Sequence, residues 1–257
     1  GDGGLGPLGP EGDGRGRGCA RHFEDHHQGA GRNLGAGGNL DLDHATGERC
    51  RHFHGGLVTF HGDDDYEKWL GVASLPKLNY RSEKLREVMY AGEDSIMQKW
   101  LRPPYRIDGW RLDVANMMAR QGDSQLGHKV GRGLRRAIKE EFPDAFILGE
   151  NFYDGTAHLQ GEELDATMNY RGFTFPVLQW LAGWEFAAQI KTPWADTHPL
   201  PTEALVAQWQ AFRAAIPWQV ALQQFNLLGS HDTARVLSVV EGDQALAQVA
   251  AVLLFTY

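Results

Sequence analysis

The chain has 257 residues, of which 42 % are hydrophobic, enough for one barrel-sized core. Its net charge of −8 and its lack of a basic cluster argue against a nucleic-acid partner. No apolar run approaches the roughly 18 residues of a membrane span, and two cysteines do not make a disulfide framework. The chain begins without a charged-then-apolar signal, so we expect a cytoplasmic protein with no membrane partner.

Residues 1–57 differ in composition from the rest of the chain. They are rich in Gly, Arg, His, Ala and Asp, contain no lysine, and include Gly-Asp-Gly-Arg-Gly-Arg-Gly at 12–18. Without a sustained period of 2 or 3.6, such a segment buries too little apolar surface to offset the entropy of ordering. We therefore expect an irregular segment that makes few contacts with the remainder.

Three interpretations of residues 1–57 are open. One is a natural disordered arm, and a second is metal binding, although the Cys-x2-His and Cys-x-His spacings build no recognised zinc pattern. The third is a frame-shifted product, because this composition is typical of a GC-rich gene translated out of frame. The residues that would bind a metal are Cys19, His22, His26, His27, Cys50, His52 and His54.

Alternating elements are predicted from residue 58 onward. Residues 74–79 form a loop, after which Ser82 caps a helix with an apolar stripe at Leu85, Val88 and Met89. Residues 92–95 interrupt this helix. The stripe resumes at 96–101 and ends at Pro103-Pro104.

The remainder alternates strands with helices, which predicts a parallel sheet. A strand leads into Asp113, and the unbroken apolar run at 145–149 is typical of a buried parallel strand. The further predicted elements are a helix at 124–141, a strand at 164–169, a helical, Trp-rich stretch at 174–224, a strand at 225–229, a helix at 242–250 and a strand from 251 to 257.

Three short segments each place a carboxylate at the end of an apolar run. They are Asp108-Gly-Trp-Arg-Leu-Asp113, Leu148-Gly-Glu150 and Gly229-Ser-His-Asp232. A single carboxylate at a strand end is often only a helix cap. Three in series, on separate strands with helices between, are how a (β/α)8 barrel assembles an active site.

The order and neighbours of these segments resemble the nucleophile, acid/base and His-Asp motifs of glycoside hydrolase family 13, the α-amylase family. The resemblance covers residues 58–257 and implies an α/β fold, an incomplete (β/α)8 TIM barrel with about strands 4–8 and the preceding helix. The family's Asp-x-x-x-Asn-His motif is absent, and the nearest string is Asp41-Leu-Asp-His44. We therefore expect residues 1–57 to lie outside the barrel, and the chain to be an inactive or weakly active fragment.

The resemblance also implies roles for individual residues. Asp113 would be the nucleophile, Glu150 the general acid/base, and Asp232 a third carboxylate that stabilises the transition state. Arg111, on the same strand face as Asp113, would keep that carboxylate ionised. The remaining substrate-binding candidates are His231, Asn116 and Arg235, the last two with a structural role as the equal alternative. Trp110, Tyr170, Phe173 and Phe175 could stack on sugars, although an aromatic in a barrel is more often core.

The finer pattern indicates a substrate class. Leu75-Pro-Lys-Leu-Asn79 resembles the neopullulanase, cyclomaltodextrinase and maltogenic amylase group, and the segments at 168–176 and 230–235 resemble maltodextrin glucosidase. The implied reaction is retaining hydrolysis of α-1,4 bonds in short maltodextrins, with an α-glucan oligosaccharide as partner, no organic cofactor and no metal. Two alternatives stay open, a transglycosylase of the same family and a non-catalytic carbohydrate-binding barrel.

Overall fold

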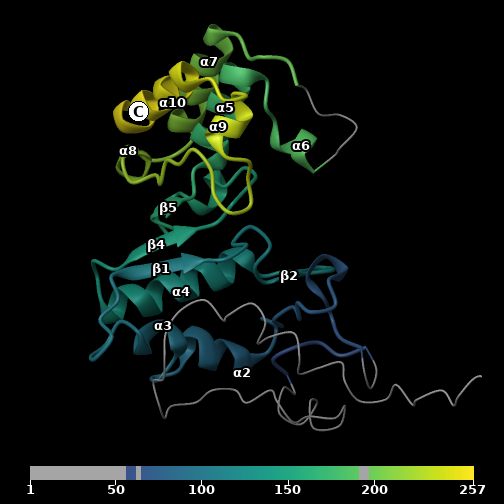
Figure 1. The fold of residues 1–257 in the computed structure, drawn as a ribbon. Coiled ribbons are helices and arrows are strands. Elements are labelled where there is room, and N and C mark those ends of the chain that lie inside the picture. The colour runs from purple at the N-terminus through teal and green to yellow at the C-terminus, as the bar shows by residue number, and fades with distance from the viewer. Residues whose placement is uncertain (1–55, 62–64, 191–196) are drawn as a thin grey trace, which may run out of the picture. The chain divides into compact units, whose positions relative to one another are not determined.

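The computed structural model describes residues 56–61, 65–190 and 197–257 (Figure 1). The interpretations of residues 1–57 therefore concern residues that lie almost wholly outside the described part. The chain divides into two compact units, Gly1–Leu85 and Arg86–Tyr257, and each is treated separately below. No helix among the described residues is long and apolar enough to cross a bilayer.

The described part of the first unit is built from isolated bridges. Antiparallel bridges join Val58 to Leu78, Phe60 to Tyr66 and Lys68 to Pro76. A short 3-10 helix, η1, occupies Trp69–Gly71. The predicted cap is present, because the backbone N–H of Leu85 donates a 3.3 Å hydrogen bond to Ser82 Oγ, at the start of α2 (Glu83–Arg86).

The second unit begins with two short helical segments that follow the predicted pattern. The π-helix η2 (Glu87–Ala91) ends at Gly92, whose backbone is extended, and α3 (Ile96–Lys99) resumes after Ser95. Met97 and Leu101 are buried, but Val88 and Trp100 are exposed. The predicted interruption is therefore present, whereas the predicted apolar stripe is only partly buried.

A parallel sheet in the order β1-β4-β5 lies within the second unit. β1 (Gly109–Leu112) pairs with β4 (Phe146–Gly149), and β5 (Ala166–Thr167) pairs with the other edge of β4. The two strands predicted before Asp113 and at 145–149 are present, and the one predicted at 164–169 is shortened. An antiparallel pair that sequence reasoning missed, β2 (Arg120–Gln121) and β3 (Ser124–Gln125), follows β1.

Helix α4 (Gly127–Glu141) fills most of the predicted span 124–141 and buries one face. Val130, Leu134 and Ile138 recur every four residues and are fully buried, because this spacing keeps side chains on one helix face. The buried carboxylate of Asp165 ties α4 to the sheet. It pairs at 2.7 Å with Arg135 Nη1 and at 2.9 Å with Lys139 Nζ, and it accepts the backbone N–H of Ile147 in β4 at 3.0 Å.

Residues 174–224 are largely helical in the described part, as predicted, and prolines mark two of the breaks. α7 begins directly after Pro201 and α8 directly after Pro217, positions where a missing N–H costs no helical hydrogen bond. The helices from η3 to α8 are η3 (Thr156–His158), η4 (Tyr170–Thr174), α5 (Phe175–Ala182), α6 (Phe186–Gln189), α7 (Thr202–Ala214) and α8 (Trp218–Ala221).

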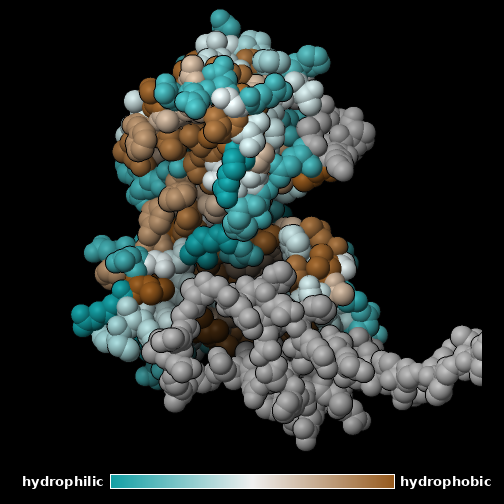
Figure 2. All heavy atoms as spheres, in the orientation of Figure 1, coloured by the Kyte–Doolittle hydropathy of each residue, from teal (hydrophilic) through white to brown (hydrophobic). Residues whose placement is uncertain are grey.

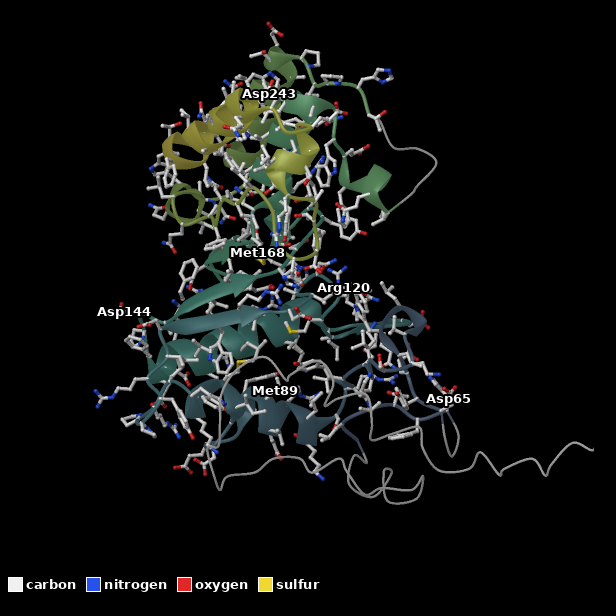
Figure 3. The ribbon with its side chains drawn as sticks, viewed as in Figure 1. Asp65, Met89, Arg120, Asp144, Met168 and Asp243 are labelled. Carbon is white, nitrogen blue, oxygen red and sulfur yellow. The ribbon has the colours of Figure 1, made fainter. Side chains whose placement is uncertain are left out.

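Two predicted strands are wrong. Residues 225–229 form no strand, and only Phe225 makes a parallel bridge, with Met168. Residues 251–257 continue α10 (Gln244–Thr256), which follows α9 (Val236–Val239). Asp243, labelled in Figure 3, caps α10 by accepting two backbone N–H groups. A seven-residue apolar run fits helix or strand equally well, so its neighbours decide between them.

The sheet and the helices of the second unit meet at a buried cluster of Met168, Tyr170 and Leu227. Figure 3 shows Met168 between the strands and the helices from α5 to α10. Apolar side chains also gather on the surface over α8 and α10 (Figure 2). The most exposed of them are Trp218, Leu222, Val252 and Phe255.

Candidate active site

Parallel pairing places Asp113 and Glu150 at the same edge of the sheet. Leu112 is in register with Gly149, so the residues that follow these two strand ends are neighbours. Their environments differ sharply. The side chain of Asp113 is 74 % exposed and that of Glu150 is 5 % exposed. Two carboxyl groups in such different surroundings are suited to different protonation states.

Arg111 contacts both carboxylates. Its Nη1 pairs with Asp113 Oδ1, and its Nη2 lies 2.7 Å from Glu150 Oε1. The sequence predicted the first contact, because residues two apart on a strand share a face. The second depends on the pairing of β1 with β4. A single guanidinium therefore bridges the two carboxyl groups.

The second oxygen of Glu150 accepts a hydrogen bond from the backbone of the neighbouring strand end. The N–H of Val114 donates to Glu150 Oε2 at 2.8 Å. Val114 has a φ of 45°, which is costly for a β-branched residue. Strained backbone of this kind is concentrated at functional sites. Sequence analysis did not single out Val114, since no local pattern signals the conformation.

Burial raises the pKa of Glu150. The Val114 N–H and the charge of Arg111 oppose this effect, and the negative charges of Asp113 and Asp232 add to it. Burial is the largest of these causes, so Glu150 keeps its proton to a higher pH than an ordinary glutamate. The influence of Asp232 on this pKa also shows that the third carboxylate lies within electrostatic range of Glu150.

Asp232 and His231 lie in a loop stabilised by Ser230. His231 Nε2 is 3.1 Å from Asp232 Oδ2. The backbone N–H of Asp232 donates to Ser230 Oγ at 3.1 Å, and the N–H of Ser230 donates to Thr233 Oγ1 at 2.9 Å. Tyr170 donates its hydroxyl to Ser230 Oγ at 2.7 Å. The loop is therefore held from the buried cluster rather than by a preceding strand.

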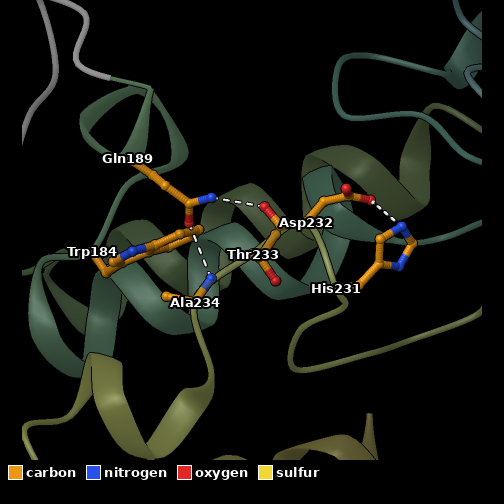
Figure 4. A pocket seen from close by; sticks show the side chains of 6 residues that line it. All are labelled: Trp184, Gln189, His231, Asp232, Thr233 and Ala234. Carbon is orange, nitrogen blue, oxygen red and sulfur yellow. Dashed lines mark hydrogen bonds and ion pairs between the residues drawn. The ribbon is translucent and has the colours of Figure 1, made fainter. Parts of the chain in front are cut away.

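An open pocket of about 540 Å³ lies beside this loop (Figure 4). Gln189 Nε2 donates to the backbone oxygen of Asp232 at 2.7 Å, and Gln189 Oε1 accepts from Ala234 N at 3.1 Å. Asp113 and Glu150 are not among the residues that line the pocket. Those residues are Trp184, Gln189, His231, Asp232, Thr233 and Ala234. Gln189 and Trp184 were missed by sequence reasoning, since neither lies in a recognised motif.

The two remaining candidates have different surroundings. Asn116 is half-buried in the turn that follows β1, and no hydrogen bond to another described residue assigns it a role. Arg235 Nη1 donates to the backbone oxygen of Ser230 at 3.0 Å, so Arg235 stabilises the loop that carries Asp232. The substrate-binding role of Asn116 and Arg235 stays a prediction.

The aromatic candidates are mostly core, which was the alternative given for them. Tyr170 and Phe173 are fully buried. Trp110 donates its indole N–H to the backbone oxygen of Met97 at 3.0 Å. Phe175 is partly buried and stacks on Tyr170, with ring centroids 5.5 Å apart.

Comparison with known proteins gives the family. Residues 52–257 match the family described as "Alpha amylase, catalytic domain". A cyclomaltodextrinase from a Bacillus species is 34 % identical over 201 residues, covering 78 % of this chain and 31 % of the relative. The intracellular maltogenic amylase of Bacillus subtilis (strain 168) is 31 % identical over 204 residues, covering 79 % and 29 %.

A solved structure supports the same family. The cyclic α-maltosyl-(1→6)-maltose hydrolase of Arthrobacter globiformis, in complex with cyclic α-maltosyl-(1→6)-maltose, is 28 % identical with a TM-score of 0.64, covering 78 % of this chain and 40 % of that one. The chain spans just under a third of the length of the two curated relatives. Its parallel sheet with surrounding helices is consistent with an incomplete (β/α)8 barrel. The protein belongs to the α-amylase family, glycoside hydrolase family 13.

Proposed function

We propose that this chain is part of an enzyme that hydrolyses α-1,4-glucosidic bonds in short maltodextrins with retention of configuration. The observation that carries the proposal is the pair of carboxyl groups on one guanidinium, with Asp113 exposed and Glu150 buried. Retaining hydrolysis needs two carboxyl groups about 5–5.5 Å apart, of which one is charged and the other protonated.

Asp113 is the nucleophile in this proposal. Its carboxylate attacks the anomeric carbon while the glycosidic C–O bond breaks and the Glu150 carboxyl gives its proton to the leaving oxygen. A water molecule then gives a proton to Glu150 and attacks the anomeric carbon, which releases Asp113. The exposure of Asp113 supports its role as the attacking group, and the raised pKa of Glu150 supports its role as proton donor.

Asp232 and His231 bind the sugar in this proposal. Asp232 lines the open pocket, and its charge acts on Glu150. A negative charge at this place would stabilise the oxocarbenium-like transition state and help Glu150 to keep its proton. The substrate class is supported by the names of the relatives, a cyclomaltodextrinase and a maltogenic amylase. The word intracellular in the second name supports a cytoplasmic location, which fractionation of the source cells would test.

The roles are tested best in a completed barrel. In a chimera, residues 58–257 replace the matching segment of the Bacillus cyclomaltodextrinase, and product release from maltotriose is measured. Asp113→Asn should lower turnover by on the order of 10³-fold or more while maltotriose still binds, because the amide keeps the shape but cannot attack. The matched control is Asp123→Asn in the exposed β2-β3 turn. Activity of Asp113→Asn within tenfold of the parent would remove the residue from the nucleophile role.

Glu150 is tested by the choice of leaving group. Nitrophenolate leaves without protonation, so Glu150→Gln should lose far more activity on maltotriose than on a nitrophenyl maltoside, whereas Asp113→Asn should lose both. Equal losses of Glu150→Gln on the two substrates would contradict an acid role. An active chimera that yields longer maltodextrins at the expense of glucose would indicate a transglycosylase. A parent chimera that binds maltotriose without turnover would indicate a non-catalytic barrel.

A further inference from the structure

A second cluster of ionisable side chains lies outside the proposed active site. His128 is near the start of α4, His158 ends η3, and Glu163 is in the segment that leads to β5. His128 Nδ1 lies 2.8 Å from Glu163 Oε1, and His158 Nδ1 lies 2.6 Å from Glu163 Oε2. The two imidazole rings stack with centroids 4.4 Å apart. One ligand atom from each residue lies within 4.8 Å of the others.

Two of the three side chains in this cluster are nearly buried. The side chains of Glu163 and His158 are 5 % and 10 % exposed, whereas that of His128 is 45 % exposed. The carboxylate of Glu163 lies against the backbone of α4 at Gly131, where a Cβ would come within 2.7 Å of Oε2. Glycine at position 131 leaves room for the carboxylate to lie directly against this turn of the helix.

The neighbouring Asp165 shows how this fold neutralises a buried carboxylate with permanent charges. Asp165 is paired with Arg135 and Lys139. Glu163 has two imidazoles instead, and Arg132 Nη1 approaches only to 3.4 Å, from a half-exposed side chain. Arg135 Nη1 reaches the backbone oxygen of Glu163 at 3.5 Å rather than its carboxylate. Two imidazole nitrogens and a carboxylate form a donor set that suits zinc-class ions.

We propose that His128, His158 and Glu163 bind a divalent transition-metal ion of the zinc class. Bonds of about 2.1 Å place tetrahedral ligand atoms about 3.4 Å apart, wider than the present 2.6 and 2.8 Å. The half-exposed His128 and Arg132 can move outward to admit the ion, and water completes its coordination on that side.

The ion would have a structural role. It joins α4 to the segment between β4 and β5, which begins with Glu150. The sequence analysis predicted no metal and did not single out these three residues, which are 30 and 5 positions apart and match no spacing motif. A metal at this place goes beyond the proposed hydrolysis and does not depend on it.

The test is a Co²⁺ titration of the full 257-residue chain, followed by visible d–d absorption and by competition with Zn²⁺. Cys19→Ser and Cys50→Ser are included in every variant, so that the N-terminal Cys and His residues do not form a rival site. Glu163→Gln and His128→Ala should each weaken binding at least about tenfold, as loss of a direct ligand requires. His61→Ala is the matched control, since His61 makes a 2.8 Å pair with Glu67 and no second imidazole joins this pair among the described residues.

Chelation gives an independent readout. EDTA should lower the Tm of the metal-loaded parent and leave the Tm of Glu163→Gln unchanged. If circular dichroism shows that Glu163→Gln is unfolded, the metal affinity of His128→Ala tests the proposal instead. The side chain of His128 is half-exposed, so its removal should leave the fold intact. No Co²⁺ binding by the parent, or equal affinity in the parent and both triad variants, would overturn the proposal. None of these measurements uses a sugar, so this outcome is separate from that of the proposed hydrolysis.

Discussion

The hydroxyl of Tyr170 donates a 2.7 Å hydrogen bond to Ser230 Oγ, which joins two residues 60 positions apart. Tyr170 is fully buried and stacks on Phe152 at 4.3 Å. Ser230 Oγ in turn accepts the backbone N–H of Asp232. The buried Tyr170 therefore holds the loop that carries the third carboxylate, although no strand precedes that loop.

Tyr170→Phe should lower the free energy of unfolding by about 1 kcal/mol, because it removes one buried hydrogen bond and keeps the stacked ring. Urea unfolding of the full chain measures this change. Tyr153→Phe at an exposed position is the control. Ser230→Ala should cost a similar amount, and the double variant should cost less than the sum of the two. Strict additivity would show that the two hydroxyl groups do not interact.

Glu150 should make stability depend on pH. Its pKa is raised above the ordinary value of 4.5, chiefly by burial. A carboxyl group with a higher pKa in the folded state binds more protons when folded than when unfolded, between the two pKa values. Its contribution to stability is therefore fully present below the unfolded pKa and is lost as the pH rises through the folded pKa.

Relative to Glu150→Gln, the free energy of unfolding of the parent should fall as the pH rises through that window. Urea unfolding at a series of pH values gives the difference in unfolding free energy between the parent and Glu150→Gln. The readout is how this difference changes with pH, because a constant difference in stability between the two proteins does not affect that change. Glu162→Gln, at an exposed position, controls for the loss of one negative charge. A difference that stays flat, or that grows in favour of the parent with rising pH, would contradict the raised pKa.

Gly109→Ala should destabilise the sheet by about 1–3 kcal/mol, the usual range for overpacking. A Cβ at Gly109 would collide with the backbone oxygen of Phe146 and lie 2.7 Å from its nitrogen. Neither atom can move without opening the pairing of β1 with β4. Gly127→Ala in α4 is the control, because its Cβ would meet only ordinary contacts from 3.4 Å and a helix favours alanine. Equal melting temperatures for Gly109→Ala and the parent would show that the strands are not packed this closely.

The 257-residue chain by itself should release little or no glucose from maltotriose. The described residues supply one three-stranded parallel sheet, and catalysis needs the carboxyl groups held within about 0.5 Å of productive geometry. The assay compares the purified chain with its Asp113→Asn variant. Turnover clearly above that variant would show that the chain completes a working site without further strands.

The coding DNA should reveal a change of reading frame close to where the barrel sequence begins. The family match starts at residue 52, six residues before the boundary at 58 predicted from composition. Residues before the match carry the Gly, Arg, Ala and His excess of an out-of-frame product. Resequencing the gene from its source decides this point. A single uninterrupted frame that encodes residues 1–57 as given would remove the frame-shift hypothesis.

The sequence by itself determined the features that depend on neighbouring residues. The apolar run at 145–149 predicted the strand that became β4. The two-residue spacing of Arg111 and Asp113 predicted that their side chains lie on the same face of the preceding strand. Ser82 was placed as a helix cap for the same reason, because a cap acts within three residues. The order of the three carboxylates, together with the residues beside them, was sufficient to predict the family.

The tertiary structure decided the features that depend on contacts between segments far apart in the sequence. The apolar run at 251–257 fits either period. In the structure it continues α10 to Thr256, and Tyr257 stacks on Trp209 of α7 with ring centroids 4.2 Å apart. The unequal burial of Asp113 and Glu150 depends on the pairing of β1 with β4, in which Gly109 is in register with Phe146 and Leu112 with Gly149, 37 positions further along the chain. One strand end is exposed at Asp113 and the other is covered at Glu150. Burial and long-range electrostatics are properties of the assembled surroundings, and no local spacing in a sequence encodes them.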